Sequence, residues 1–135
     1  MKSVLRNLTV LIVDDELGFR EILEDEFRLL GAKTLTADCV QAAEVLIQEH
    51  EIDLILSDSS MPGQSGVVFL EKVRRGPKGG TPFILMTGFA DHDSHAAESR
   101  GADALFIKPF EMDQLIAKSE SLLIQIREKR TKESA

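Results

Sequence analysis

The stretch from Ile52 to Gly66 constrains the fold more than any other part of the sequence. Its apolar core, Leu54-Ile55-Leu56, has the pattern of a buried strand and leads to one carboxylate, Asp58. The strand cannot continue past Met61-Pro62-Gly63, because proline lacks the N–H that a sheet ladder requires and glycine favours a turn. A carboxylate at the end of a buried strand is costly unless another group pairs with it. The rest of the chain should therefore supply that partner.

Four other apolar runs have the character of strands, and helical segments separate them. The first run, Leu8–Val13, is apolar almost throughout, which is typical of a strand covered on both faces. The other three runs are 33–36, 82–86 and 103–107. The expected helical segments are 19–30, about 42–47, 66–75, 91–100 and a long one that begins near 111. The apolar residues of the first segment recur at helical spacing and should form its buried stripe: Phe19, Ile22, Leu23, Phe27 and Leu30.

Strands that alternate with helices predict a single-domain α/β protein with a parallel sheet and helices on both faces. We expect the flavodoxin-like (βα)5 architecture, with the strands in the order 2-1-3-4-5. The domain would occupy residues 1–135, with a core from about 5 to 128 and a frayed, charged tail over 129–135. The segment 91–100 consists mostly of small and polar residues, so it should be the least stable helix.

Charge and residue content exclude several classes of protein. Lys and Arg total 16 against 23 Asp and Glu, a net charge of −7, which argues against direct DNA binding because DNA-binding proteins carry a basic face. Cys39 is the single cysteine, so no internal disulfide can form. No apolar run approaches the ~18 residues of a membrane span, and the first residues lead into a strand rather than a signal peptide. We therefore expect a cytoplasmic protein without a membrane segment.

In a parallel sheet the carboxyl ends of all strands meet at one edge, where ligands bind. The polar side chains that should reach this edge are Asp14, Asp15, Asp58, Thr87 and Lys108. The three carboxylates would repel one another, and a divalent cation would relieve this repulsion. Oxygen ligands without a neighbouring His or Cys favour Mg²⁺, with Mn²⁺ as an alternative. We expect Asp15 to bind the ion directly and Asp14 to bind it through water or to support the site.

A hydroxyl and an ammonium beside a divalent cation suit a phosphoryl group whose charge changes during transfer. Thr87 and Lys108 would supply these two groups. Asp58 is then the candidate nucleophile and would form an aspartyl phosphate.

This set of residues resembles the receiver domain of two-component response regulators, of the CheY-like, stand-alone type. The resemblance covers about residues 5 to 128 and rests on Asp14-Asp15, Asp58 followed by Met61-Pro62 and Gly66, Thr87-Gly88, and Lys108-Pro109. It implies that the protein is a signalling phosphoacceptor rather than an enzyme. Such a phosphoacceptor catalyses only its own phosphorylation and dephosphorylation. A histidine kinase or a phosphotransfer protein would phosphorylate Asp58.

The resemblance also implies roles for individual residues. Asp14, Asp15, Asp58 and the backbone carbonyl of Ser60 would hold Mg²⁺. Thr87 and Lys108 would contact the phosphoryl oxygens. Ser60 and Phe89 would occupy positions that tune the phosphoryl lifetime, and Lys108-Pro109 matches a peptide bond that is often cis in this family.

In this family, phosphorylation shifts the population of a switch. Thr87 would move toward the phosphoryl group and Phe106 would turn inward. The face formed by the segment 91–100, the strand 103–107 and the final helix would then change its affinity for a downstream protein target. That helix should overhang the sheet, and an exposed Leu123 and Ile124 would fit a monomer or a weak homodimer through the same face.

Three other functions compete with this interpretation. An aspartate-nucleophile phosphatase would carry a second carboxylate two residues after the nucleophile, where this chain has Ser60. A flavodoxin would have a glycine-rich phosphate loop after its first strand, where Asp14-Asp15-Glu16 would repel phosphate. An interaction module that works without phosphorylation stays open, although the presence of all five site residues argues against it.

Overall fold

The structure is a computed structural model that describes residues 3–88 and 101–134. Five parallel strands form one sheet in the order β2-β1-β3-β6-β7. Their bounds are β1 Thr9–Val13, β2 Lys33–Ala37, β3 Leu54–Asp58, β6 Phe83–Thr87 and β7 Ala104–Ile107. Because β6 and β7 are the fourth and fifth of the expected strands, this confirms the flavodoxin-like order 2-1-3-4-5.

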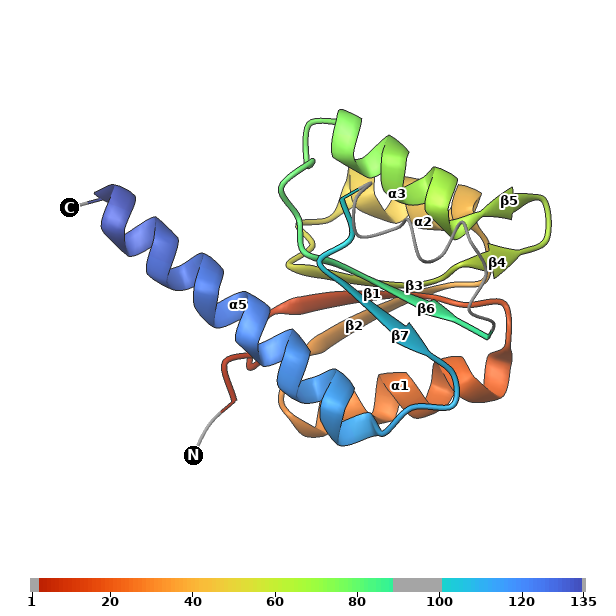
Figure 1. The fold of residues 1–135 in the computed structure, drawn as a ribbon, viewed down its shortest axis with the longest axis horizontal. Coiled ribbons are helices and arrows are strands. Elements are labelled where there is room, and N and C mark those ends of the chain that lie inside the picture. Colours follow the sequence, from red (N-terminus) through yellow and green to blue (C-terminus); the bar gives the residue numbers. More distant parts are fainter. Residues whose placement is uncertain (1–2, 89–100, 135) are drawn as a thin grey trace.

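Helices cover both faces of the sheet (Figure 1). Those that the structure describes are α1 Leu17–Leu29, α2 Val40–Glu49, α3 Gly66–Arg75 and α5 Met112–Ser134. The helices α2 and α3 pack on one face, and α1 and α5 pack on the other. The helix expected over 91–100 lies outside the described residues. Every residue of the central strand β3 is buried, which explains why Leu54, Ile55 and Leu56 are apolar without alternation.

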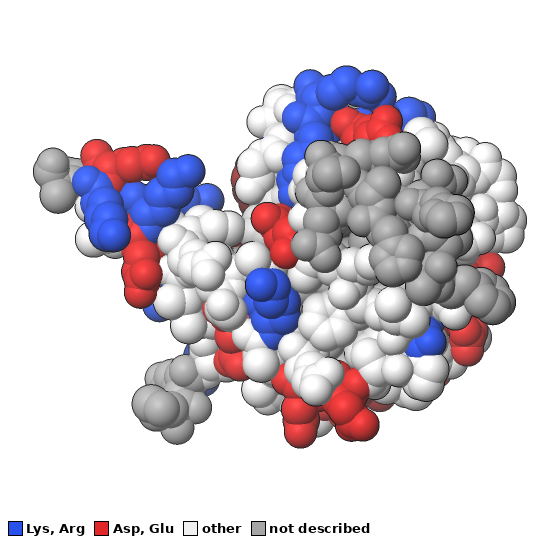
Figure 2. Space-filling model, in the orientation of Figure 1, with Lys and Arg blue, Asp and Glu red and all other residues white. Residues whose placement is uncertain are grey.

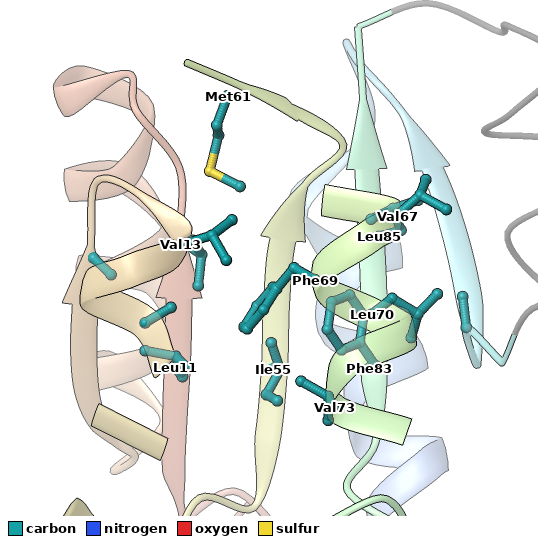
Figure 3. Close-up of a cluster of buried hydrophobic side chains, with 14 of the residues drawn as sticks. Leu11, Val13, Ile55, Met61, Val67, Phe69, Leu70, Val73, Phe83 and Leu85 are labelled. Atoms are coloured by element: carbon teal, nitrogen blue, oxygen red, sulfur yellow. The ribbon is translucent and has the colours of Figure 1, made fainter. Parts of the chain in front are cut away.

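Two apolar cores lie on opposite sides of the sheet. Figure 3 shows the core beneath α2 and α3, in which Phe69 of α3 meets Phe83 of β6 edge-on with ring centroids 5.6 Å apart. Met61 closes this core at the end where the strands reach their carboxyl edge. The second core joins Leu23 and Phe27 of α1 to α5. The sheet is therefore fixed from both sides, and its carboxyl edge is a rigid base for a site.

The apolar stripes of two helices differ in part from the sequence expectation. Ile22, which the helical spacing assigns to the buried stripe of α1, is 53% exposed, because the face centred on Leu23 and Phe27 is the one that meets the sheet. On α5, Leu123 is buried and only Ile124 is exposed. The expected Leu123 and Ile124 patch is thus reduced to one side chain.

The helix α5 continues to Ser134, past the end near 128 that the sequence suggested. Residues 129–134 are therefore helical where a frayed tail was expected. The Lys, Arg and Glu residues among them are strong helix formers, and Glu128 with Lys132 and Lys129 with Glu133 have the favourable i, i+4 spacing of opposite charges. The end of α5 stands clear of the body in Figure 1, and Figure 2 shows charged side chains of both signs along it. Among the described helices, none combines the length and apolar character that crossing a bilayer requires.

A short antiparallel hairpin follows β3, formed by β4 (Ser60–Met61) and β5 (Gln64–Ser65). Its turn holds Pro62 and Gly63, and Gly63 has a φ of 84°, a left-handed value that glycine adopts without strain. The sequence predicts this turn but not the pairing of the residues that flank it. The hairpin leads directly into α3, so it fixes how the chain leaves Asp58.

Candidate functional site at the carboxyl edge of the sheet

The three carboxylates that the sequence assigns to the sheet edge do converge there. Asp14 and Asp15 follow the last residue of β1, and Asp58 ends β3, the neighbouring strand, with Val13 paired to Ser57. One carboxylate oxygen of each residue lies within 4.8 Å of the others. Asp14 is fully buried, Asp58 is 8% exposed and Asp15 is exposed. The cluster therefore has a closed inner side and an open outer side.

Asp14 has partners for both carboxylate oxygens. The backbone N–H of Glu16 donates to Oδ1 at 2.9 Å, and Lys108 Nζ donates to Oδ2 at 2.9 Å. Arg20 also donates to the backbone carbonyl of Asp14 at 2.7 Å, which ties the first turn of α1 to the end of β1. Asp14 is thus held in place by main chain and side chains together.

Asp58 has weaker contacts. Its Oδ1 accepts a long hydrogen bond of 3.4 Å from the backbone N–H of Ser60, and its Oδ2 lies 3.7 Å from Lys108 Nζ. Burial raises the pKa of Asp58, and the negative charges of Asp14 and Asp15 raise this pKa further. Lys108 and the Ser60 N–H lower the pKa of Asp58, but not enough to cancel this rise. The negative charge of Asp58 is therefore only partly compensated by its neighbours.

The main chain around Asp58 is fixed by neighbours on both sides. The N–H of Ser59 donates to Met86 of β6 at 2.7 Å, and the N–H of Gly66 donates to the Ser59 carbonyl at 2.9 Å. A Cβ at Gly66 would lie 2.0 Å from the carbonyl oxygen of Asp58, so only glycine fits there. The hydroxyl of Ser65 caps α3 by accepting hydrogen bonds from two backbone N–H groups of its first turn. The start of α3 and the phosphoacceptor candidate are thus packed against each other.

Thr87 and Lys108 reach the same edge from β6 and from the end of β7. Thr87 follows Met86, the residue paired with Asp58, and it is 2% exposed. The backbone N–H of Lys108 donates to the Thr87 carbonyl at 2.6 Å. The Lys108–Pro109 peptide bond is cis, as the resemblance implied.

The remaining expected site residues are Ser60, Phe106 and Phe89. Ser60 is exposed beside Asp58, at the start of the hairpin. Phe106 is half-buried on β7, and its ring meets that of Phe110 edge-on with centroids 5.3 Å apart. Phe89 lies outside the described residues.

Sequence reasoning missed one neighbour of the site, Phe19. Its ring lies under Lys108, with Nζ 4.3 Å from the ring centroid. The helical spacing assigned Phe19 to the core stripe of α1. The only signal of another role was its position four residues after Asp15, in the first turn of the helix that leaves the acidic edge.

The donor set fits a divalent cation bound through oxygen. Three carboxylates and the single ammonium of Lys108 leave the cluster with an excess of negative charge. All candidate ligand atoms within the described cluster are carboxylate oxygens, which hard cations such as Mg²⁺ prefer. The exposed side, at Asp15, leaves room for water and for phosphate oxygens in the remaining coordination positions.

Comparison with known proteins assigns the chain to a family. The family model of the response regulator receiver domain matches residues 10–120, which include all the site residues above. The chain belongs to the response regulator receiver domain family. Receivers are signalling phosphoacceptors rather than classical enzymes, bind Mg²⁺ through an acidic pocket, and interact with histidine kinases or phosphotransfer proteins and with downstream targets.

Relatives of this receiver include both short and long proteins. This chain is 35% identical over 132 residues to the probable transcriptional regulator ycf27 of Cyanidium caldarium. The match covers 97% of this chain and 52% of the relative. The chain is 32% identical over 124 residues to the probable chemotaxis protein CheY of Rhizobium etli, with 89% of this chain and 95% of that protein covered. The chain thus spans about half the length of several curated relatives and nearly all of another.

The solved structures agree with this assignment. The receiver is similar to response regulator TrrA of Thermotoga maritima in complex with Mg²⁺–BeF, with a TM-score of 0.77 and 30% sequence identity. The match covers 85% of this chain and 98% of TrrA. Both the sequence and the arrangement of elements therefore place this chain among receivers.

Proposed function

We propose that this receiver accepts a phosphoryl group on Asp58 from a histidine kinase or a phosphotransfer protein, in a Mg²⁺-dependent reaction. The observation that supports the proposal most is the position of Lys108 between Asp14, at 2.9 Å, and Asp58, at 3.7 Å, in a cluster of three carboxylates. A phosphoryl group on Asp58 would offer this ammonium three further oxygens. TrrA, a relative crystallised with Mg²⁺–BeF, also supports the choice of ion.

Each site residue would have its own role in the reaction. Asp58 Oδ attacks the phosphorus, so an O–P bond forms as the bond from phosphorus to the donor breaks. Asp14, Asp15, Asp58 and the Ser60 carbonyl would hold Mg²⁺, which neutralises charge on the phosphoryl oxygens when bound. Lys108 and the Thr87 hydroxyl would donate hydrogen bonds to those oxygens. The raised pKa of Asp58 fits this scheme, because Lys108 and the Ser60 N–H do not fully compensate its charge and a bound cation would add to their effect.

The output would pass through protein contacts in the cytoplasm rather than through direct DNA binding. Thr87 and Phe106 would move on phosphorylation and change the face formed by the segment 91–100, β7 and α5. The protein would be a monomer or a weak homodimer through this face, to which Ile124 would not contribute, because it lies beside Leu29 and Leu30 at the end of α1. Ser60 and Phe89 would tune the lifetime of the phosphoryl group, and slow self-dephosphorylation is expected.

The test is the intact mass of the protein after incubation with acetyl phosphate and Mg²⁺. The wild type should gain one phosphoryl group, EDTA should abolish the gain, and Asp58→Asn should show none. Asp25→Asn, an exposed carboxylate on α1, is the matched control and should gain as much as the wild type. A folded wild type that gains nothing from acetyl phosphate or from any histidine kinase tested would favour the interaction module that works without phosphorylation.

A further inference from the structure

The first turn of α1 places an aromatic ring at the site for which the proposed reaction has no role. Lys108 Nζ lies 4.3 Å from the centroid of the Phe19 ring, and the same atom lies 2.9 Å from Asp14 and 3.7 Å from Asp58. The Lys108 side chain is only 20% exposed. The ammonium therefore contacts a ring and two carboxylates at a largely buried position, where a cation–π contact is stronger than at an open surface.

The Phe19 ring is itself held in place by other rings. Phe110 meets Phe19 edge-on, with centroids 5.9 Å apart and an interplanar angle of 81°. Phe106 meets Phe110 in the same way at 5.3 Å. The three rings come from α1, from the loop after Pro109 and from β7. Arg20, next to Phe19, bonds the backbone of Asp14, so the turn that carries the ring is tied to the acidic edge.

We infer that Phe19 is a positioning residue for Lys108 during phosphoryl transfer to Asp58. This inference rests on the proposed function. To reach a phosphoryl oxygen on Asp58, the ammonium must turn away from Asp14, the carboxylate that it now contacts at 2.9 Å. A ring attracts a cation without requiring one hydrogen-bond direction, so Lys108 can turn between the two carboxylates and keep the ring contact. The ring thus keeps the ammonium within reach of Asp58 and away from bulk water.

The experiment is the rate of phosphorylation by acetyl phosphate at saturating Mg²⁺, measured by intact mass in a double-mutant cycle. Phe19→Leu should slow the wild type about 3- to 10-fold, because it removes one partly desolvated cation–π contact. Phe19→Trp should restore most of the rate. In a Lys108→Met background, Phe19→Leu should have no further effect, because its influence passes through the ammonium.

Phe27→Leu is the matched control. Phe27 is fully buried on the same helix two turns away and takes the same chemical change, but it has no contact with Lys108 among those the structure gives. It should lower the free energy of unfolding and leave the phosphorylation rate within twofold. Phe19→Met is a second ringless variant, of similar volume, in case the leucine variant does not fold.

Each outcome bears on one of the two claims. If the wild type is phosphorylated but Phe19→Leu leaves its rate unchanged, the positioning role alone is overturned. The same holds if Phe19→Leu lowers the rate equally in the wild type and in the Lys108→Met background. Failure of Phe19→Trp to exceed Phe19→Leu does the same. A wild type that never takes a phosphoryl group overturns the proposed function, and the positioning role with it.

Discussion

Replacing Gly66 with alanine should displace the phosphoacceptor candidate as well as destabilise the fold. A Cβ at this position would lie 2.0 Å from the carbonyl oxygen of Asp58 and 2.9 Å from Ser59 Cα. Ordinary carbon–oxygen contacts are about 3.3 Å, so the start of α3 and the end of β3 must separate by roughly 1.3 Å. Both neighbours are backbone atoms, which cannot rotate away as a side chain would.

The size of the effect follows from this displacement. Overpacking costs about 1–3 kcal/mol, and loss of the 2.9 Å hydrogen bond from Gly66 N–H to Ser59 adds about 1 kcal/mol, so unfolding should become easier by about 2–4 kcal/mol. Because the contact is made with Asp58 itself, the carboxylate must also move. A misplacement of about 1 Å can slow a reaction by as much as 100-fold, so the phosphorylation rate should fall more than the stability loss alone explains.

The assay pairs urea denaturation with the acetyl phosphate reaction, using two other glycines as controls. Gly18 and Gly80 have no heavy atom within 4 Å of a built Cβ. Gly18→Ala, inside α1, should stabilise the protein by up to about 1 kcal/mol, and neither control should alter the rate more than twofold. The reasoning fails if Gly66→Ala matches these controls in both measurements.

Three other predictions concern stability and can be read from urea denaturation. Ser65→Ala removes the cap of α3 and should cost about 1 kcal/mol, and an unchanged midpoint would show that the cap contributes nothing. Arg74 donates hydrogen bonds to the Asp103 carboxylate and to three backbone carbonyls, so Arg74→Ala should lower the free energy of unfolding by about 2–4 kcal/mol. Arg75→Ala, at the exposed neighbouring residue, should change it by no more than about 0.5 kcal/mol. Equal losses in the two variants would refute this role of Arg74. The pKa of Asp58 is raised in the folded state, so the protein loses stability as the pH rises from the ordinary carboxyl value of 3.8 through the raised value. In metal-free buffer Asp58→Asn should therefore be more stable than the wild type above this window, with a gain that shrinks as the pH falls through it; a gain that is the same at every pH contradicts the shift.

The strand order and the convergence of the site residues could be predicted from the sequence because they follow from local patterns and general rules of topology. Apolar runs locate the strands, and parallel strands necessarily gather their carboxyl ends. Asp14 and Lys108 are 94 positions apart, yet each is placed simply by the strand that it follows. No side-chain geometry is needed for that step.

The features that escaped prediction depend on how distant surfaces fit together. Helical spacing defines a face of α1 but not which edge of that face meets the sheet. It therefore predicts a buried Ile22, which is exposed, and does not predict the contact of Phe19 with Lys108. The close approach of Gly66 to Asp58 is a contact between two backbones that no side-chain pattern records. The length of α5 escaped as well, because exposed charged residues are compatible with either a helix or a frayed tail.

The end of α5 that projects from the body in Figure 1 would act as a lever. Leu123 is the last buried residue of the helix, and Ser134 lies 11 positions further on, about 16 Å at the rise of an α-helix. A tilt of about 10° at Leu123 would carry the tip by about 3 Å. Displacements too small to alter the packing of the second core would thus become larger at Ser134. A change of tilt would therefore be larger at the end of the helix than at its base.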